Sequence, residues 1–93
     1  MPTYTLVWTK PFARDAKRFL RMHPDLTPRF RQILDRLAED PFAPSLRLHA
    51  LQGNLAGRYA VSLTYAYRIT LNLLIAETEI HLLGIGTHDE VYG

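Results

Sequence analysis

The sequence predicts an α+β fold: an N-terminal strand, a two-helix hairpin, and then an antiparallel β-meander forming a twisted sheet with the helices on one face. Three observations support this prediction. A β-branched and aromatic segment begins the chain, two stretches with apolar residues at helical spacing follow, and four short strand-like segments complete it. The 93 residues suffice for one hydrophobic core, so we expect a single domain over residues 1–93.

Residues 3–9 (TYTLVWT) form the expected first strand, in which Trp8 is interpreted as a core residue. From Pro11 onward, apolar residues recur on one helical face while basic residues point away from it. The apolar positions are Phe12, Ala16, Phe19 and Leu20, and the basic positions are Arg14, Lys17, Arg18 and Arg21. This pattern predicts an amphipathic helix with a basic outer side.

A second helix is predicted after the pair His23-Pro24, because the residue before a proline is disfavoured in the α region. We expect His23 to cap the first helix or to interact with its dipole. Thr27 is the expected N-cap of the second helix, followed by a proline at the first helical position. Its apolar positions are Phe30, Ile33, Leu34, Leu37 and Ala38, and residues 40–41 end the pattern.

Four short segments separated by breaks of hairpin length predict the antiparallel meander. They span residues 47–51, 58–64, 67–75 and 79–85. Along the third segment, apolar residues at odd positions from Tyr67 to Leu73 alternate with Arg68, Thr70 and Asn72. Because the helices are expected to cover the apolar side, Arg68 should lie on the opposite, solvent-reachable face.

Composition narrows the function classes. No apolar run is long enough to cross a bilayer and no secretory leader is evident, so we expect a cytoplasmic protein without membrane contact. The chain has no cysteine, and its four histidines are not spaced as metal ligands, so no metal and no cofactor are expected. Residues 1–50 carry nine Lys/Arg against five Asp/Glu, an excess that is compatible with contact to a polyanion, but charge alone favours two solvated helix faces.

Four residues are candidates for chemistry: His49 near a strand end, Arg68 on the polar face, and His88 and Tyr92 after the last strand. In an antiparallel meander these positions can converge on one groove. His88 follows two glycines, in a loop where a residue that only packs is not expected, so a functional role is favoured for it. The alternatives are a surface histidine at position 49 and an exposed ion pair for Arg68.

Two histidines and an arginine suit cleavage of RNA by its own 2′-hydroxyl. One imidazole removes the proton of the hydroxyl and another protonates the departing 5′-oxygen, since imidazole titrates near neutral pH. Arg68 would stabilise the negative charge that develops on the phosphorus centre. Tyr92 would stack on an unpaired base or donate its hydroxyl to the phosphate.

The segments LHALQGNLAGRYAVSLTYAYRI and IHLLGIGTHDEVYG resemble the RelE/ParE toxins of type II toxin–antitoxin modules, and most closely the branch with the YafQ-type messenger RNA interferases. The resemblance covers essentially the whole chain. It implies a RelE-like fold and a ribosome-dependent endoribonuclease that is neutralised by a cognate antitoxin protein. It also implies proton-transfer roles for His49 and His88, a phosphate role for Arg68, and the position of the C-terminal aromatic for Tyr92.

Exposed basic side chains are candidates for binding RNA, including ribosomal RNA. They are Lys10, Lys17, Arg18, Arg47 and Arg58. His81 alternates with apolar neighbours on a strand and is interpreted as structural or exposed.

The chain departs from the YafQ-type branch at three positions. Ser62 stands where that branch has a histidine, Ala66 lies near its acidic residue, and Gly84 lies near its arginine. The resemblance to other branches implies that Arg68 replaces the missing arginine. These departures keep two alternatives open: a non-enzymatic toxin of the ParE type that inhibits DNA gyrase, and a module component without catalysis.

Overall fold

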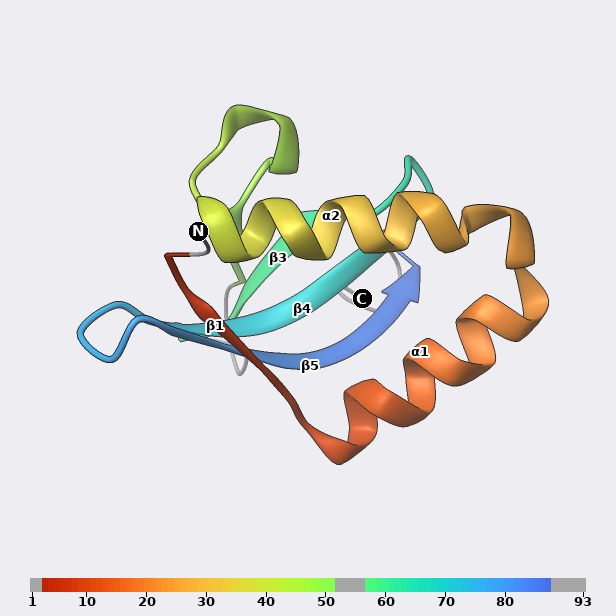
Figure 1. Cartoon of the computed structure of the whole chain (residues 1–93), viewed down its shortest axis with the longest axis horizontal. Coiled ribbons are helices and arrows are strands. Elements are labelled where there is room, and N and C mark those ends of the chain that lie inside the picture. Colours follow the sequence, from red (N-terminus) through yellow and green to blue (C-terminus); the bar gives the residue numbers. More distant parts are fainter. Residues whose placement is uncertain (1–2, 52–56, 88–93) are drawn as a thin grey trace.

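The computed structural model describes residues 3–51 and 57–87, which contain five strands, two α-helices and two short 3-10 helices. In chain order they are β1 (Thr5–Trp8), α1 (Lys10–Met22), η1 (Pro24–Leu26), α2 (Thr27–Glu39), η2 (Pro44–Leu46), β2 (His49–Ala50), β3 (Tyr59–Ser62), β4 (Tyr67–Leu74) and β5 (Glu79–Thr87). Figure 1 shows α2 crossing in front of the sheet. The α+β fold class predicted from the sequence is confirmed.

The strands form one sheet in the order β1-β5-β4-β3-β2. From β2 to β5 each strand pairs antiparallel with the next, as the meander prediction requires. β1 joins the other edge and pairs in parallel with β5, with Thr5 opposite Glu79 and Trp8 opposite Leu82. The residue pattern of β1 identifies a strand but not its partner, so this parallel pairing is a finding of the structure.

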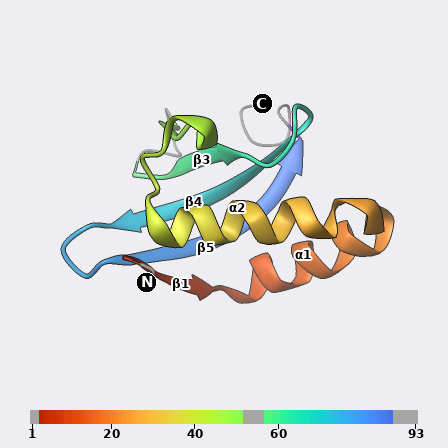
Figure 2. The same ribbon diagram turned by 45° about the horizontal axis from the view of Figure 1, so that its top comes forward.

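The core lies between the sheet and the two helices, which cover the same face of it (Figure 2). The predicted helix faces supply Phe12, Ala16, Phe19, Phe30, Ile33, Leu34 and Leu37, and the strands and the β3–β4 turn supply Val61, Leu63, Ile69, Leu71, Ile80 and Leu82. Burial of these apolar side chains is the main force that holds the layers together. The apolar faces predicted for both helices and for β4 are confirmed.

Trp8 is 47% exposed, so its interpretation as a core residue is wrong. β1 is an edge strand, and the indole covers the rim of the core instead of entering it. The ring packs edge-on against Phe12 at 4.9 Å and against Phe30 at 6.1 Å between centroids.

The two helices begin differently from the prediction. Thr9 caps α1 by accepting a hydrogen bond from the Phe12 N–H at 3.4 Å. Thr27 is not an N-cap: it is already helical, and its hydroxyl donates to the carbonyl of Pro24 at 2.9 Å. The η1 turn leads directly into α2, so no extended residue stands before the helix. Within the described part of the chain, neither helix combines the length and apolarity that crossing a bilayer requires.

The first strand of the meander is shorter than predicted, with β2 confined to His49 and Ala50 instead of residues 47–51. Arg47 follows η2 in the left-handed region with φ 54°, a conformation that cannot continue a strand. Leu51 still connects to the sheet, because its N–H donates to the carbonyl of Arg58 at 2.8 Å.

Helix α1 takes over the edge of β5 where β1 ends. β1 pairs with β5 as far as Leu82, and beyond that point a carboxylate oxygen of Asp15 accepts the N–H of Ile85 at 3.3 Å. A Cβ atom at Gly84 would lie 3.1 Å from the same Asp15 oxygen, so glycine lets the carboxylate approach the strand. Asp15 thus satisfies a backbone donor that a neighbouring strand would otherwise engage.

Candidate functional site

The face of the sheet opposite the helices carries two of the four candidate catalytic residues. Cross-strand partners project to the same side of a sheet. Two rows cross this face: His49–Ala60–Thr70–Gly84 and Ser62–Arg68–Gly86. His49 and Arg68 therefore share it, and standard strand spacings place their Cα atoms about 12 Å apart. The predicted side of Arg68 is confirmed.

Access to this face is uneven. His49 is exposed and Arg68 is partly exposed, whereas Ala60 between them is buried. The face is therefore open to solvent at these two candidate side chains but not along its whole length.

The guanidinium of Arg68 is held at the turn between β3 and β4. Its Nη1 atom donates to the carbonyl oxygens of Thr64, Tyr65 and Tyr67 at 2.9, 3.0 and 3.2 Å. Among the described residues, no acceptor engages Nε or Nη2 and no carboxylate pairs with Arg68, so the ion-pair alternative is not supported there. The contacts orient the planar group by one nitrogen and leave the other donors of the fork for an anion.

The imidazole of His49 is oriented by the backbone that leads into β2. Its Nδ1 atom lies 2.7 Å from the carbonyl oxygen of Arg47. A carbonyl can only accept, so this contact places a proton on Nδ1, and in the neutral ring the lone pair is then on Nε2.

His88 and Tyr92 lie outside the described residues, which end at Thr87. Thr87 is paired with Tyr67, the neighbour of Arg68. The proposed convergence of all four candidates thus stays a prediction for these two.

The basic candidates are all exposed, but they do not form one patch. Lys10, Lys17 and Arg18 lie on α1 at the β5 side of the sheet, whereas Arg47 and Arg58 lie beside β2 and β3 near the opposite edge. Arg18 is also 3.7 Å from the carboxylate of Asp15, although its side chain is 69% exposed. The two groups therefore flank the sheet instead of lining one groove.

Two further histidines have structural partners. The backbone N–H of His23 caps α1 by donating to the carbonyl of Phe19 at 2.8 Å, which confirms the capping prediction. Its Nε2 atom also lies 3.1 Å from the hydroxyl of Tyr67, beside a cavity of about 350 Å³ between α1 and the end of β5. His81 lies 3.1 Å from a carboxylate oxygen of Glu79 and is half-buried, in agreement with a structural or exposed role.

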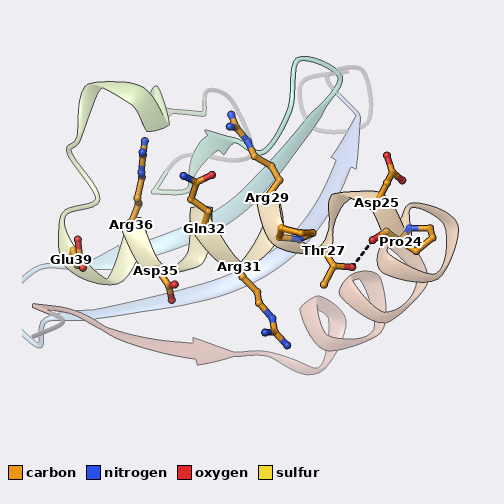
Figure 3. Close-up of a pocket in the computed structure, with 10 residues that line it drawn as sticks. Pro24, Asp25, Thr27, Arg29, Arg31, Gln32, Asp35, Arg36 and Glu39 are labelled. Atoms are coloured by element: carbon orange, nitrogen blue, oxygen red, sulfur yellow. Dashed lines mark hydrogen bonds between the residues drawn. The ribbon is translucent and has the colours of Figure 1, made fainter.

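A broader hollow of about 1070 Å³ runs along the outer side of η1 and α2. Figure 3 shows that Arg29, Gln32 and Arg36 project to one side of α2 and Arg31 and Asp35 to the other. Charges of both signs line this hollow, and no histidine does.

Two features of the site were missed from the sequence. Tyr65, at the tip of the β3–β4 turn, is 98% exposed and its carbonyl holds Arg68. Tyr67 links the same turn to α1 through His23. Tyr65 lies in a turn and belongs to no periodic pattern, and the partner of Tyr67 lies on a distant helix, so neither contact was predictable from spacing.

No protein-family model and no curated protein matches the chain by sequence. Solved structures do match it by fold. The YafQ toxin of E. coli is 16% identical, with a TM-score of 0.79 over 97% of this chain and 99% of that chain. YafQ in the E. coli DinJ-YafQ toxin-antitoxin complex scores 0.78 at 16% identity over 98% and 99%.

A third match is the YoeB/ParE toxin of Agrobacterium tumefaciens, which is 19% identical with a TM-score of 0.76 over 90% of this chain and 98% of that chain. At these identities the likeness concerns the fold. All three neighbours are RelE/ParE superfamily toxins, and the chain accordingly has the fold of the RelE/ParE toxins.

Proposed function

We propose that the chain is the toxin of a type II toxin–antitoxin module and cleaves messenger RNA on the ribosome. The observation that carries the proposal is the common face of His49 and Arg68, where the arginine is oriented by one nitrogen and keeps donors for a phosphate. The shared fold with toxins such as YafQ supports the same assignment. A cytoplasmic location follows from a ribosomal substrate.

In this mechanism the 2′-hydroxyl of the message attacks the adjacent phosphorus, and the 5′-oxygen leaves. His49, with its Nδ1 proton fixed by the Arg47 carbonyl, accepts the hydroxyl proton at Nε2. His88 donates a proton to the leaving oxygen, and Arg68 stabilises the charge of the transition state. Tyr92 stacks on a base next to the cleaved bond or donates its hydroxyl to the phosphate.

The positions that depart from the YafQ-type branch fit a rearranged site. Ser62 is directly opposite Arg68 in the β3–β4 register, so Arg68 stands next to the place of the branch's additional histidine. A Cβ atom at Gly84 would lie 3.1 Å from the carboxylate of Asp15, so a side chain there would push this carboxylate away from the strand. Arg68 thus supplies the cation of the site from β4 instead of β5.

The test is cleavage of a defined message on programmed ribosomes. The purified chain should generate new 5′ ends in the message when ribosomes are present and not when they are absent. A message with 2′-deoxyribose at the mapped nucleotide should resist cleavage, because the attacking hydroxyl is missing.

Histidine variants assign the roles. His49→Gln and His88→Gln should each lower the single-turnover rate by about 10²–10⁴. His81→Gln is the matched control, because this histidine lies on the same face near β1 and should leave the rate unchanged. Wild-type rates for both His49→Gln and His88→Gln would show that the proton-transfer roles proposed for these histidines are wrong, and absence of cleavage by the wild-type chain would show that the nuclease proposal is wrong.

The alternative toxin activity has its own readout. Inhibition of DNA supercoiling by gyrase, with the message intact, would identify a ParE-type binding toxin. Absence of growth arrest on expression of the chain alone would indicate a component without catalysis.

The proposed partner is a cognate antitoxin protein encoded beside the toxin, as in the DinJ-YafQ toxin-antitoxin complex. Its segment is expected to cover the basic side chains flanking the sheet or the helical hairpin, where the hollow along α2 offers charges of both signs. A calorimetric titration with the product of the adjacent gene should show a complex. Absence of binding would contradict this partner.

A further inference from the structure

Tyr65 is an aromatic residue without a packing role in the fold. It lies at the tip of the turn between β3 and β4, and it is 98% exposed. No positive φ is recorded there, so the turn imposes no particular residue type at this position. Turn tips are usually occupied by small or polar residues, so a bare phenol ring at such a place contributes nothing to folding.

The turn beneath this ring is held in place by several elements. The hydroxyl of Thr64 accepts the N–H groups of Ala66 and Tyr67 at 3.3 and 3.2 Å. From α2, the Nε atom of Arg29 donates to the carbonyl of Leu63 at 3.1 Å, and the Leu63 side chain is fully buried. These contacts fix the backbone that carries the ring, so a bound ligand would not have to order it.

The same turn holds the cation of the candidate site. Arg68 donates from Nη1 to the carbonyls of Thr64 and Tyr65, at 2.9 and 3.0 Å. Tyr65 therefore exposes its ring to solvent and also anchors the guanidinium of Arg68 through its main-chain carbonyl. Because the guanidinium lies 3.0 Å from the main-chain carbonyl of Tyr65, the base of a nucleotide whose phosphate is bound by Arg68 would lie near this residue.

We propose that the ring of Tyr65 is a stacking surface for an unpaired base of the RNA whose phosphate is bound by Arg68. This inference rests on the proposed function, because it takes single-stranded message as the ligand. Stacking needs an exposed aromatic face and a strand with unpaired bases, and it tolerates any base since each has a π-face. Tyr65 therefore contributes affinity for the message without selecting its sequence.

The experiment measures binding separately from cleavage. Ribosomes are programmed with a message that carries 2′-deoxyribose at the cleaved nucleotide, and the affinity of the chain is compared with that for empty ribosomes. The variants are Tyr65→Ala, Tyr65→Phe and Tyr65→Trp. Ile75→Ala is the matched control, since Ile75 is a 60% exposed apolar residue at the hairpin on the other end of β4.

Tyr65→Ala should weaken binding to programmed ribosomes by about 5- to 150-fold, the range that loss of one base stack corresponds to. Binding to empty ribosomes should not change. Tyr65→Phe and Tyr65→Trp should retain wild-type affinity, because both keep an aromatic face, and Ile75→Ala should bind as the wild type does.

Three outcomes would overturn the inference. They are wild-type binding by Tyr65→Ala, an equal loss in Tyr65→Phe that would assign the contact to the hydroxyl, and no preference of the wild-type chain for programmed over empty ribosomes. The first two leave the nuclease proposal standing if the wild-type chain cleaves an unmodified message. Failure of that cleavage with normal binding would instead reject the proposed activity and keep the stacking contact.

Discussion

The hairpin between β3 and β4 and the hairpin between β4 and β5 lie at opposite ends of β4, and their turns are held in different ways. At the β4–β5 end the bonds are local or reach the neighbouring edge strand. The N–H of Thr78 donates to the carbonyl of Ile75 at 3.1 Å, and the N–H of Thr5 donates to the carbonyl of Thr78 at 2.9 Å.

At the β3–β4 end, side chains from outside the turn reach it. Arg29 arrives from α2, His23 arrives from the end of α1 to meet Tyr67, and Arg68 folds back from β4 itself. The β4–β5 hairpin shows that a turn on this strand closes without such tethers. The added contacts therefore fix the position of Arg68 and the turn tip, as the proposed binding of RNA at this end requires.

The largest difference between the two hairpins should appear in stability. Leu63→Ala, which removes a fully buried side chain from the β3–β4 turn, should lower the free energy of unfolding by about 2–5 kcal/mol. Ile75→Ala, at the exposed end, should change it by less than about 0.5 kcal/mol. Urea denaturation followed by circular dichroism measures both. Equal losses would show that the two turns are tied to the core alike.

The next effect concerns cleavage. Arg68→Gln should lower the single-turnover rate on programmed ribosomes by about 10²–10³, because the developing phosphate charge loses a donor fork. Arg68→Lys should recover little of it, since a single ammonium group cannot both hold the turn carbonyls and bind a phosphate bidentately. Glu77→Gln, at the other hairpin, is the control and should cleave at the wild-type rate. A similar loss of the cleavage rate in Glu77→Gln would show that the effect is not specific to the β3–β4 end of the strand.

Much of the fold was predictable because it depends on local periodicity. Both apolar helix faces and the alternation along β4 follow from residue spacing alone, and so does the side of the sheet that carries Arg68. The parallel pairing of β1 was not predictable, because it joins segments that are separated by the whole helical hairpin. The capping error at Thr27 arose because η1, which has no pattern of its own, leads straight into α2.

The candidate site likewise has one part that was predictable from the sequence and one part that was not. Residue types that are suited to phosphate chemistry indicated His49 and Arg68, and the strand register places both on one face. The role of Tyr65 was not predictable, because it depends on an exposed fraction and on a carbonyl contact that only the folded turn creates. The wrong prediction for Trp8 has a similar cause, because the composition of a strand does not show whether it lies at the edge or in the centre of a sheet.

A smaller effect tests the tether between α1 and the β3–β4 turn. Tyr67→Phe removes the hydroxyl that lies 3.1 Å from Nε2 of His23, while its ring keeps the edge-on contact with Phe19 at 4.9 Å. The free energy of unfolding should fall by about 0.5–1.5 kcal/mol, the usual net value of one hydrogen bond. Thermal and urea unfolding give the change. A variant as stable as the wild type would show that this contact does not hold the turn.

The smallest effect should appear at the β4–β5 hairpin and with the opposite sign. Thr78 adopts a left-handed conformation with φ 52°, which costs a β-branched residue about 1–2 kcal/mol and costs glycine none of that strain. Because glycine loses more backbone entropy on folding, Thr78→Gly should raise the free energy of unfolding by at most about 1 kcal/mol. Cleavage and binding of programmed ribosomes should stay at wild-type levels, since the turn lies at the far end of β4 from Arg68. A stabilised variant with impaired binding would show that the two ends of β4 are coupled. It would contradict the view that only the β3–β4 end takes part in binding RNA.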